Sequence, residues 1–469
     1  MGSYKPTIGL EVHAELKTRT KMFCDSLNDP DEKHPNVNVC PVCLAHPGTL
    51  PVANRRAIEH VIRTGLALGG EINKVTKFDR KNYFYPDLPK GYQISQYDQP
   101  LVLGGTLRDI RIRRIHLEED TANLSHVNGG SLVDFNRSGM PLMELVTEPD
   151  FRSADQVADF ARELQLILRY LGVSDANMEK GQMRIEANVS LNMGTKVELK
   201  NINSFKAVHD AVEYELKRQG EALRAGETVH QETRGWNEAK QQTFSQRSKE
   251  EAHDYRYFPE PDLPPFETKE FEIDRLRDEL PELPIRKRER FMKEYGLDAK
   301  QTEILVGELE TANYFEKAVS ELHERLPQGR PLGVYNYLTG DLRGLMNAAG
   351  IGFRETKVLP EHLAHLAALV EENKITSRQA KDVIAKMFET GSDPEDVVAQ
   401  ESMGISSDMG EIEAVVTAVI AENEAAVRDY QKGKAASLQF LIGKAMAKLK
   451  GRARPEMLTD LFRRTLGTG

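Results

Sequence analysis

The chain has 469 residues, of which 39% are hydrophobic and 29% are charged, and its formal net charge is −10. A chain of this length exceeds one ordinary hydrophobic core, so we expect two to four domains. No apolar run approaches the roughly 18 residues that a membrane span needs, and the start MGSYKPTIGLEVH lacks the features of a secretory signal. These features predict a cytoplasmic protein that has no membrane contact.

The first predicted element is a strand over residues 8–16. Apolar residues occupy every even position from Ile8 to Leu16, which is the period of a half-buried strand. Glu11, His13 and Glu15 therefore lie on the opposite face of this strand.

Three cysteines, Cys24, Cys40 and Cys43, follow the strand. So few cysteines in a long chain argue against a disulfide framework and indicate a reducing compartment. A CxxC pair with a third cysteine nearby is typical of zinc, but a tetrahedral structural site needs a fourth ligand. Unmetallated structural cysteines are an open alternative, and a redox pair is a weaker one. The candidates for a fourth ligand are Asp25, His34 and His46.

Helical patterns begin after Asn54 and after Ser153. In the second of these, Ser153 and Gln156 predict a capping box and Gly172 predicts the end of the helix. The apolar stripe of this helix consists of Val157, Phe160, Leu164, Ile167, Leu168 and Leu171.

Three further predicted strands, over residues 115–120, 183–191 and 197–200, also alternate between apolar and polar residues. Polar residues on one face are ordinary in an antiparallel sheet. Carboxylates crowded on one face would nevertheless repel each other without a divalent cation, and oxygen ligands with one imidazole suit Mg²⁺ or Mn²⁺. The sequence does not say whether the strands are neighbours. The residues on their polar sides are His116, Glu118, Asp120, Arg184, Glu186, Asn188, Ser190 and Glu198, and Glu144 is a further candidate.

Six prolines between Phe258 and Pro284 predict a stiff extended connection without helix or strand. We therefore predict an α+β domain that ends near residue 294, with helices beyond it. The helix after Thr376 carries apolar residues at helical spacing and ends at Gly391. A second break is predicted near residues 402–410, where glycine and serine cluster.

The end of the chain is basic. Residues 432–469 contain nine Lys or Arg against two acids, a net charge of +7, so the other residues sum to −17. Such segregation predicts a local patch that binds a polyanion, and a merely solvated basic tail is the alternative. The candidate polyanion-binding residues in this patch are Lys444, Lys448, Lys450, Arg452 and Arg454.

Several catalytic motifs are missing from the sequence. It has no GxxxxGK[ST] phosphate loop, no GxGxxG, no GxSxG and no HExxH. Any phosphoryl transfer would therefore depend on metal ions and scattered basic residues. The sequence also contains no Ser-Ser-Lys amidase signature and no Cys-His glutaminase arrangement.

Five sequence blocks resemble the signature blocks of the GatB family, in the same order. The block of seventeen residues from Lys81 is the most specific of them. The related GatE proteins share these blocks but carry a large inserted domain, for which this chain is too short. The blocks are IGLEVH from Ile8, KNYFYPDLPKGYQISQY from Lys81, VDFNRSG from Val133, ELVTEPD from Glu144 and DYRYFPEPDLPP from Asp254.

The resemblance implies an α+β cradle domain with an antiparallel sheet over residues 1–293. It further implies a helical domain over residues 294–405 and a small helical tail similar to YqeY proteins over residues 406–469. It also implies a reaction. GatB proteins use ATP to phosphorylate the side-chain carboxylate of misacylated Glu-tRNA(Gln) or Asp-tRNA(Asn), and ammonia then displaces the phosphate to leave an amide.

The partners implied by the resemblance are an amidase subunit, GatA, which releases ammonia from glutamine, and a small subunit, GatC, which holds the complex together. A heterotrimer is therefore expected. Whether the non-discriminating aminoacyl-tRNA synthetase also binds stays open. A non-catalytic tRNA-binding scaffold and a GatE-type enzyme restricted to Glu-tRNA(Gln) are the alternative functions.

Similarity to the family also implies roles for individual residues. His13, Glu118 and Glu144 would hold one Mg²⁺, and Glu11, Glu186 and Glu198 would lie near a second one. The family more often has an aspartate at the position of Glu186, and some members have a second cysteine at the position of Ser26. Lys81 and Lys90 fall where the family lines its ammonia passage. The aromatic residues that could stack on bases are Tyr83, Phe84, Tyr85 and Tyr92.

Overall fold

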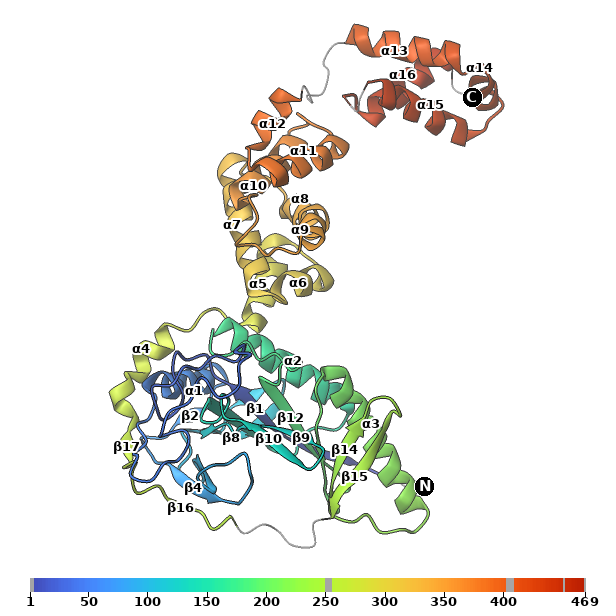
Figure 1. Cartoon of the computed structure of the whole chain (residues 1–469). Coiled ribbons are helices and arrows are strands. Elements are labelled where there is room, and N and C mark those ends of the chain that lie inside the picture. The colour runs from blue at the N-terminus through green and yellow to red at the C-terminus, as the bar shows by residue number, and fades with distance from the viewer. Residues whose placement is uncertain (1–3, 249–254, 402–408, 450–451, 468–469) are drawn as a thin grey trace. The chain divides into compact units, whose positions relative to one another are not determined.

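The computed structural model describes residues 4–248, 255–401, 409–449 and 452–467. The chain forms two compact units, Met1–Pro284 and Ile285–Gly469 (Figure 1). The predicted α+β class is confirmed, because the first unit is built on a sheet and helices dominate the second. None of the helices in the described ranges is long and apolar enough to cross a membrane.

A large sheet forms the centre of the first unit. Within the described residues its strands run in the order β15-β14-β13-β12-β1-β11-β8-β6-β2, and β7 pairs with β8 beside this path. The sheet is antiparallel, as predicted, with one exception, because β13 and β14 pair in parallel. The strands are β1 (Pro6–Glu15), β2 (Glu71–Ile72), β6 (Val102–Leu103), β7 (Thr106–Leu107), β8 (Ile110–Glu119), β11 (Pro141–Thr147), β12 (Met183–Leu191), β13 (Val197–Lys200), β14 (Glu232–Asn237) and β15 (Gln242–Ser248).

Short strands flank this sheet in three small groups. One group pairs β16 with β4 and β4 with β5, and the other two are the pairs β9–β10 and β3–β17. These strands are β3 (Val75–Thr76), β4 (Asp79–Asn82), β5 (Tyr92–Ser95), β9 (Asn123–Val127), β10 (Gly130–Asp134), β16 (Phe258–Pro259) and β17 (Phe266–Glu267).

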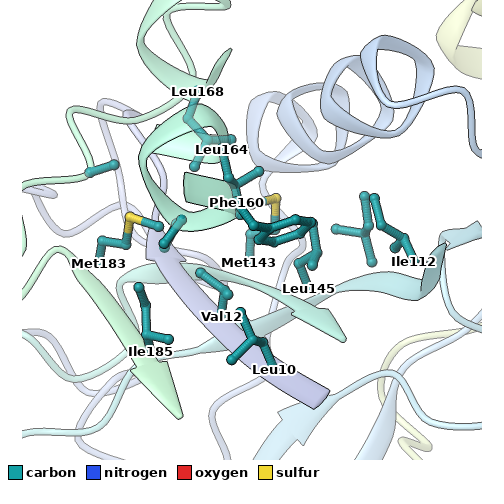
Figure 2. Packing of buried hydrophobic residues seen from close by; sticks show 14 of the residues in the cluster. Leu10, Val12, Ile112, Met143, Leu145, Phe160, Leu164, Leu168, Met183 and Ile185 are labelled. Carbon is teal, nitrogen blue, oxygen red and sulfur yellow. The ribbon is translucent and has the colours of Figure 1, made fainter. Parts of the chain in front are cut away.

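Three helices, α1 (Arg55–Ala67), α2 (Ala154–Tyr170) and α3 (Phe205–Arg224), contribute to one core with the apolar side of the sheet. In Figure 2, Phe160 and Leu164 of α2 lie above Val12 of β1 and Leu145 of β11. Burial of these apolar side chains removes their surface from water, which is the main term that holds the layers together. The opposite face of the sheet is thereby left for polar side chains.

The predicted start of α2 is confirmed at Ser153, whose side chain accepts a hydrogen bond from the Gln156 backbone N–H. The capping box is only half right. The Gln156 side chain accepts from the backbone N–H of Arg152 and not from that of Ser153. Gly172 adopts a positive φ of 66° directly after the helix, which explains its use as a stop signal.

The prediction of a proline-rich connection without helix or strand is wrong. The segment contains β16, β17, the 3₁₀ helix η1 (Thr268–Phe271) and α4 (Ile273–Asp278). Helix α4 fits between Pro265 and Pro281, where no proline interrupts the backbone, and its Leu276 is buried in the core.

The second unit is helical from its start. The predicted helix after Thr376 is confirmed as α11, with a capping box between Thr376 and Gln379 and Gly391 at its C-terminus. Residue 294 lies inside α5. The second break was predicted near residues 402–410, of which 402–408 lie outside the described residues and 409–410 are the first residues of a helix. The division into three domains therefore stays a prediction. The helices before that segment are α5 (Pro284–Tyr295), α6 (Ala299–Val306), α7 (Leu309–Arg325), α8 (Pro331–Asn336), the π-helix η2 (Tyr337–Leu342), α9 (Arg343–Ala349), α10 (Pro360–Glu371), α11 (Ser377–Thr390) and α12 (Pro394–Gln400).

Four helices close the chain: α13 (Met409–Glu422), α14 (Glu424–Gln431), α15 (Ala435–Lys448) and α16 (Pro455–Leu466). They form a hydrophobic cluster whose buried members all come from residues 412–462, among them Leu441 and Phe462. These helices therefore bury apolar side chains against one another.

Candidate active site

Neighbouring strands bring the predicted acidic residues onto one face of the sheet. His13 of β1 is directly opposite Glu144 of β11 on one side and Arg184 of β12 on the other. Glu144 is in turn opposite His116 of β8. Side chains at paired positions lie on the same face of a sheet, so this row crosses four strands on the polar side.

The first predicted metal group is assembled. One ligand atom from each of His13, Glu118 and Glu144 lies within 4.8 Å of the others. The His13 Nε2 atom lies 3.7 Å from a Glu118 carboxylate oxygen and 3.6 Å from one of Glu144. The Glu118 carboxylate also accepts hydrogen bonds from Ser95 Oγ at 2.7 Å and Gln93 Nε2 at 3.1 Å, which orient it.

Positive charge surrounds these carboxylates. Burial alone would raise the pKa of Glu118, but the Lys81 charge and the two neighbouring histidines hold it well below its usual value. Burial opposes protonation of His13, yet its hydrogen bonds to Glu118 and Glu144 outweigh burial and raise the pKa of His13 to about 10. The two carboxylates therefore favour the protonated, positively charged form of His13.

His116 lies beside this group, although we assigned it no role from the sequence. Its Nε2 atom lies 3.2 Å from Glu144 and 3.5 Å from Glu118, and the residue is almost fully buried. Burial opposes its protonation, but the Glu144 charge leads the effects that raise the pKa of His116. The sequence could have indicated this, because His116 and Glu118 are two residues apart and therefore lie on the same side of the strand.

The second predicted metal group is also assembled. Glu11, Glu186 and Glu198 each offer a carboxylate oxygen within 4.8 Å of the other two. Glu11 lies directly opposite Glu186 across the β1–β12 pair. Burial is the main cause that raises the pKa of Glu11, and the charges of Glu144 and Glu186 add to it. The Lys200 Nζ atom, 3.0 Å from Glu186 and 3.5 Å from Glu198, offsets part of this repulsion.

The donor atoms in the two groups suit a hard divalent cation, because they are carboxylate oxygens with one imidazole. A cation in the first group would compete with a proton for His13, so we expect its binding to be accompanied by proton release. The greater length of Glu186 compared with aspartate does not keep its carboxylate out of the second group. The roles of these six residues as metal ligands stay a prediction.

Both groups line a cavity of about 530 Å³ on the polar face of the sheet. Lys81 lines the same cavity, with its Nζ atom 3.8 Å from Glu118. Lys90 does not line this cavity. The Lys90 Nζ atom pairs at 2.6 Å with Glu119, and both residues line a separate cavity of about 200 Å³. The two lysines therefore line different cavities, and a shared ammonia passage stays a prediction.

The predicted aromatic residues have different surroundings. Tyr83 lines the acidic cavity, while Phe84 and Tyr85 are exposed. The Tyr92 ring lies against the Arg80 guanidinium, 4.2 Å away, which is a packing contact. Two tyrosines from the last sequence block, Tyr255 and Tyr257, line the cavity as well, although we had not assigned them a role.

The chain is similar to known proteins over both of its units. The family model of the GatB/GatE catalytic domain matches residues 6–274, and that of the GatB domain matches residues 313–466. The chain belongs to the GatB/GatE family. The expected family is thus confirmed.

Curated members of this family align with the chain from end to end. A relative from Dehalococcoides mccartyi (strain CBDB1) is 46% identical over 492 residues, which cover 100% of both chains. Relatives from Thermomicrobium roseum and Caldanaerobacter subterraneus are 47% and 46% identical, each with 99% of both chains covered. All three are named as the B subunit of aspartyl/glutamyl-tRNA(Asn/Gln) amidotransferase.

The three cysteines of this GatB/GatE chain also meet, with sulfur atoms within 4.8 Å of one another. The buried Lys21 Nζ atom lies 3.7 Å from Cys43 Sγ. A hydrogen bond from Cys24 is the main cause that lowers the pKa of Cys43 to about 4, and the Lys21 charge adds to it. No Asp, Glu or His in the described parts of the chain completes a four-ligand group, so the structure does not bring the proposed fourth ligands there. Those candidates were Asp25, His34 and His46.

Ser26 lies at the edge of this cysteine group, with its Oγ atom 3.8 Å from Cys43 Sγ. We expect Ser26→Cys to complete a tetrahedral Cys₄ site. A change outside the ligand shell typically alters metal affinity by about 10- to 100-fold. Because Ser26→Cys adds a ligand, zinc affinity should rise by more than this. Competition with a chromogenic chelator measures this affinity. Ser131→Cys adds a thiol on the exposed strand β10 and serves as the control, and equal zinc affinity in the two variants would contradict the prediction.

The predicted tRNA-binding residues of the tail differ in their contacts with the rest of the chain. Lys448 and Arg452 each form an ion pair of 2.5 Å with an acid of α13. Lys444 lies over an aromatic ring of its own helix, and Arg454 is exposed at the start of α16. Within the described residues neither Lys444 nor Arg454 has an ion pair, while Lys450 lies outside those residues. Lys444 and Arg454 are therefore the better candidates for phosphate contacts.

Proposed function

We propose that the chain is the tRNA-binding, ATP-dependent subunit of a tRNA amidotransferase. It phosphorylates the side-chain carboxylate of Glu-tRNA(Gln), Asp-tRNA(Asn) or both, and then converts that carboxylate to an amide. Support comes from the full-length similarity to proteins that are named as one subunit of aspartyl/glutamyl-tRNA(Asn/Gln) amidotransferase. The same proposal assigns the chain to the cytoplasm, where its tRNA substrates are.

The observation that carries this proposal is the meeting of two groups of possible metal ligands in one cavity. A carboxylate is a poor electrophile, so amide formation needs a better leaving group. The anionic carboxylate and ATP repel each other unless positive charge lies between them. Phosphoryl transfer depends mostly on positioning and on neutralisation of this charge.

The chemistry then has two steps. In the first, an oxygen of the substrate carboxylate attacks the γ-phosphorus of ATP, the bond to the bridging oxygen breaks, and ADP leaves. In the second, ammonia attacks the acyl carbon, the carbon–oxygen bond to phosphate breaks, and phosphate leaves with one proton of the ammonia. The product is the amide on the same tRNA.

The chain's residues have distinct tasks in these steps. His13, Glu118 and Glu144 would hold one Mg²⁺, and Glu11, Glu186 and Glu198 would hold the other. Bound Mg²⁺ supplies charge that neutralises the phosphates. Lys81 adds a cation near Glu118 that attracts the substrate carboxylate. Zinc at the three cysteines would have a structural role only.

Ammonia must come from another protein, because the sequence has no amidase or glutaminase signature. We propose an amidase subunit of the GatA type as the source and a small GatC-type subunit that joins the two. The relatives are each named as one lettered subunit, which supports an assembly of several subunits.

This division of work gives a direct test. With ATP, Mg²⁺ and misacylated tRNA, the isolated chain should form amide with a high concentration of ammonium chloride and form none with glutamine. Amide on the tRNA is measured after deacylation, and glutamate release is measured in parallel. Addition of the partner subunits should restore the use of glutamine. Glutamate release by the isolated chain would contradict the proposed division, and absence of amide with ammonium would contradict the proposed activity.

A further inference from the structure

Two guanidinium groups that the mechanism above does not use line the cavity with the two carboxylate groups, those of Arg184 and Arg114. Arg114 of β8 lines this cavity together with His116 and Glu118 of the same strand. The pairing of β8 with β11 shifts by one position here, since Val146 pairs with Arg114 but Thr147 pairs with Ile112. Such bulges are common beside active sites, where they change the direction of a side chain.

Arg114 differs from the other cations of the cavity in its contacts. Arg184 pairs with Asp120 at 2.9 Å, and Lys200 and Lys81 each lie near a carboxylate. Lys196 also lines the cavity, but it is exposed, so water can solvate its charge. For Arg114, by contrast, the described part of the chain provides no ion pair, and its buried Nε atom has no hydrogen-bond partner. A buried donor without a partner costs free energy, so this arginine is expected to find its partner in a ligand.

The adjacent arginine shows that a carboxylate partner is possible at this strand. Arg113 forms two hydrogen bonds to Glu148, at 2.9 and 2.8 Å. Arg113 does not line the cavity, whereas Arg114 does. Within the described residues, Arg113 thus has a carboxylate partner and its neighbour Arg114 has none.

The position of Arg114 relative to the second carboxylate group defines a place for an anion. Arg114 of β8 is opposite Val146 of β11, and Val146 is opposite Glu11 of β1. Glu11 is in turn opposite Glu186 of β12. Adjacent strands are about 4.8 Å apart, so the backbones at Arg114 and Glu11 are about 10 Å apart. An anion above Val146 would lie between the guanidinium and the Glu11 group.

We propose that Arg114 binds the phosphate chain of the nucleotide in this cavity, an inference that rests on the ATP-dependent function proposed above. A guanidinium presents a planar fork of N–H donors that matches two phosphate oxygens. The guanidinium stays positively charged at any physiological pH, so its binding of an anion does not depend on a change in its protonation. Arg114 then fixes the nucleotide at the end of the phosphate chain opposite the carboxylate groups.

The test measures binding of ADP, ATP and adenosine to the full-length chain with Mg²⁺ by isothermal titration calorimetry. Arg114→Gln should weaken ADP and ATP binding by about tenfold to a hundredfold, the range of a lost charge-assisted hydrogen bond, and leave adenosine binding unchanged. Arg114→Lys keeps the charge and should recover part of the loss. Arg113→Gln is the matched control, because it removes the neighbouring guanidinium outside the cavity.

The possible outcomes separate this inference from the proposed function. If the unmodified chain binds neither ATP nor ADP, the proposed function itself is wrong. If it binds both and Arg114→Gln binds them equally well, only the role of Arg114 is wrong. Equal losses for ADP and adenosine would show a damaged pocket and also overturn the inference. A raised KM for the misacylated tRNA with normal ADP binding would overturn it too, because Arg114 would then hold an anionic group of the tRNA.

Discussion

Glu118→Gln is expected to lower ATP-dependent amidation by about a hundredfold or more, the scale at which removal of one charge-stabilising group affects catalysis. Glu118 lies within the first ligand group and within 3.8 Å of Lys81. Glutamine has the same shape but no charge, so a divalent cation and the lysine would both lose their counter-charge. The measurements are amide formation with ammonium chloride and release of ADP that depends on misacylated tRNA.

The matched control is Glu148→Gln. Glu148 follows β11 directly and pairs with Arg113 outside the cavity, so this variant removes a carboxylate near the same strands but not from the site. Both variants should co-purify with the partner subunits. Amidation by Glu118→Gln at the rate of the unmodified chain would refute the metal-site hypothesis. If the unmodified chain itself showed no tRNA-dependent release of ADP, the scaffold alternative would be favoured.

Removal of residues 411–469 is expected to abolish most tRNA affinity at physiological salt concentration, while nucleotide binding persists. These residues include nearly all of α13–α16, whose buried apolar side chains form a cluster of their own. They also contain the basic segment with nine Lys or Arg against two acids. Contacts to phosphate release counterions, and each lost contact should lower the slope of log affinity against log salt by roughly one unit. Binding of the truncated and full-length chains across a salt series measures both quantities.

A double charge reversal gives a finer test of the same surface. Lys444→Glu with Arg454→Glu reverses the charge of two predicted tRNA-binding residues that have no ion pair within the described residues. It should lower the affinity for Glu-tRNA(Gln) and Asp-tRNA(Asn) together, because phosphate contacts do not read sequence. Lys180→Glu with Lys206→Glu changes the net charge equally in the first unit and is the control. If both pairs have the same effect, binding reflects only net charge. Parallel salt slopes for the truncated and full-length chains would exclude the tail from tRNA binding.

The sequence by itself determined the local elements and the kind of chemistry. The alternation of Leu10, Val12 and Ala14 with Glu11 and His13 predicted which side chains of β1 are buried, and the structure confirms it. The strands over residues 183–191 and 197–200 match β12 and β13 residue by residue. Such signals are short-range, since a strand alternates every two residues and a helix end depends on the residues beside it.

Only the tertiary structure decided which residues meet. The pairing of β1 with both β11 and β12 brings the six predicted ligands together as two groups. His116 lies beside the first group, and Lys81 and Lys90 line different cavities. None of this follows from periodicity, because register between distant strands depends on the burial of a whole sheet face and on long connections, and a shift of one residue would send every side chain to the other face.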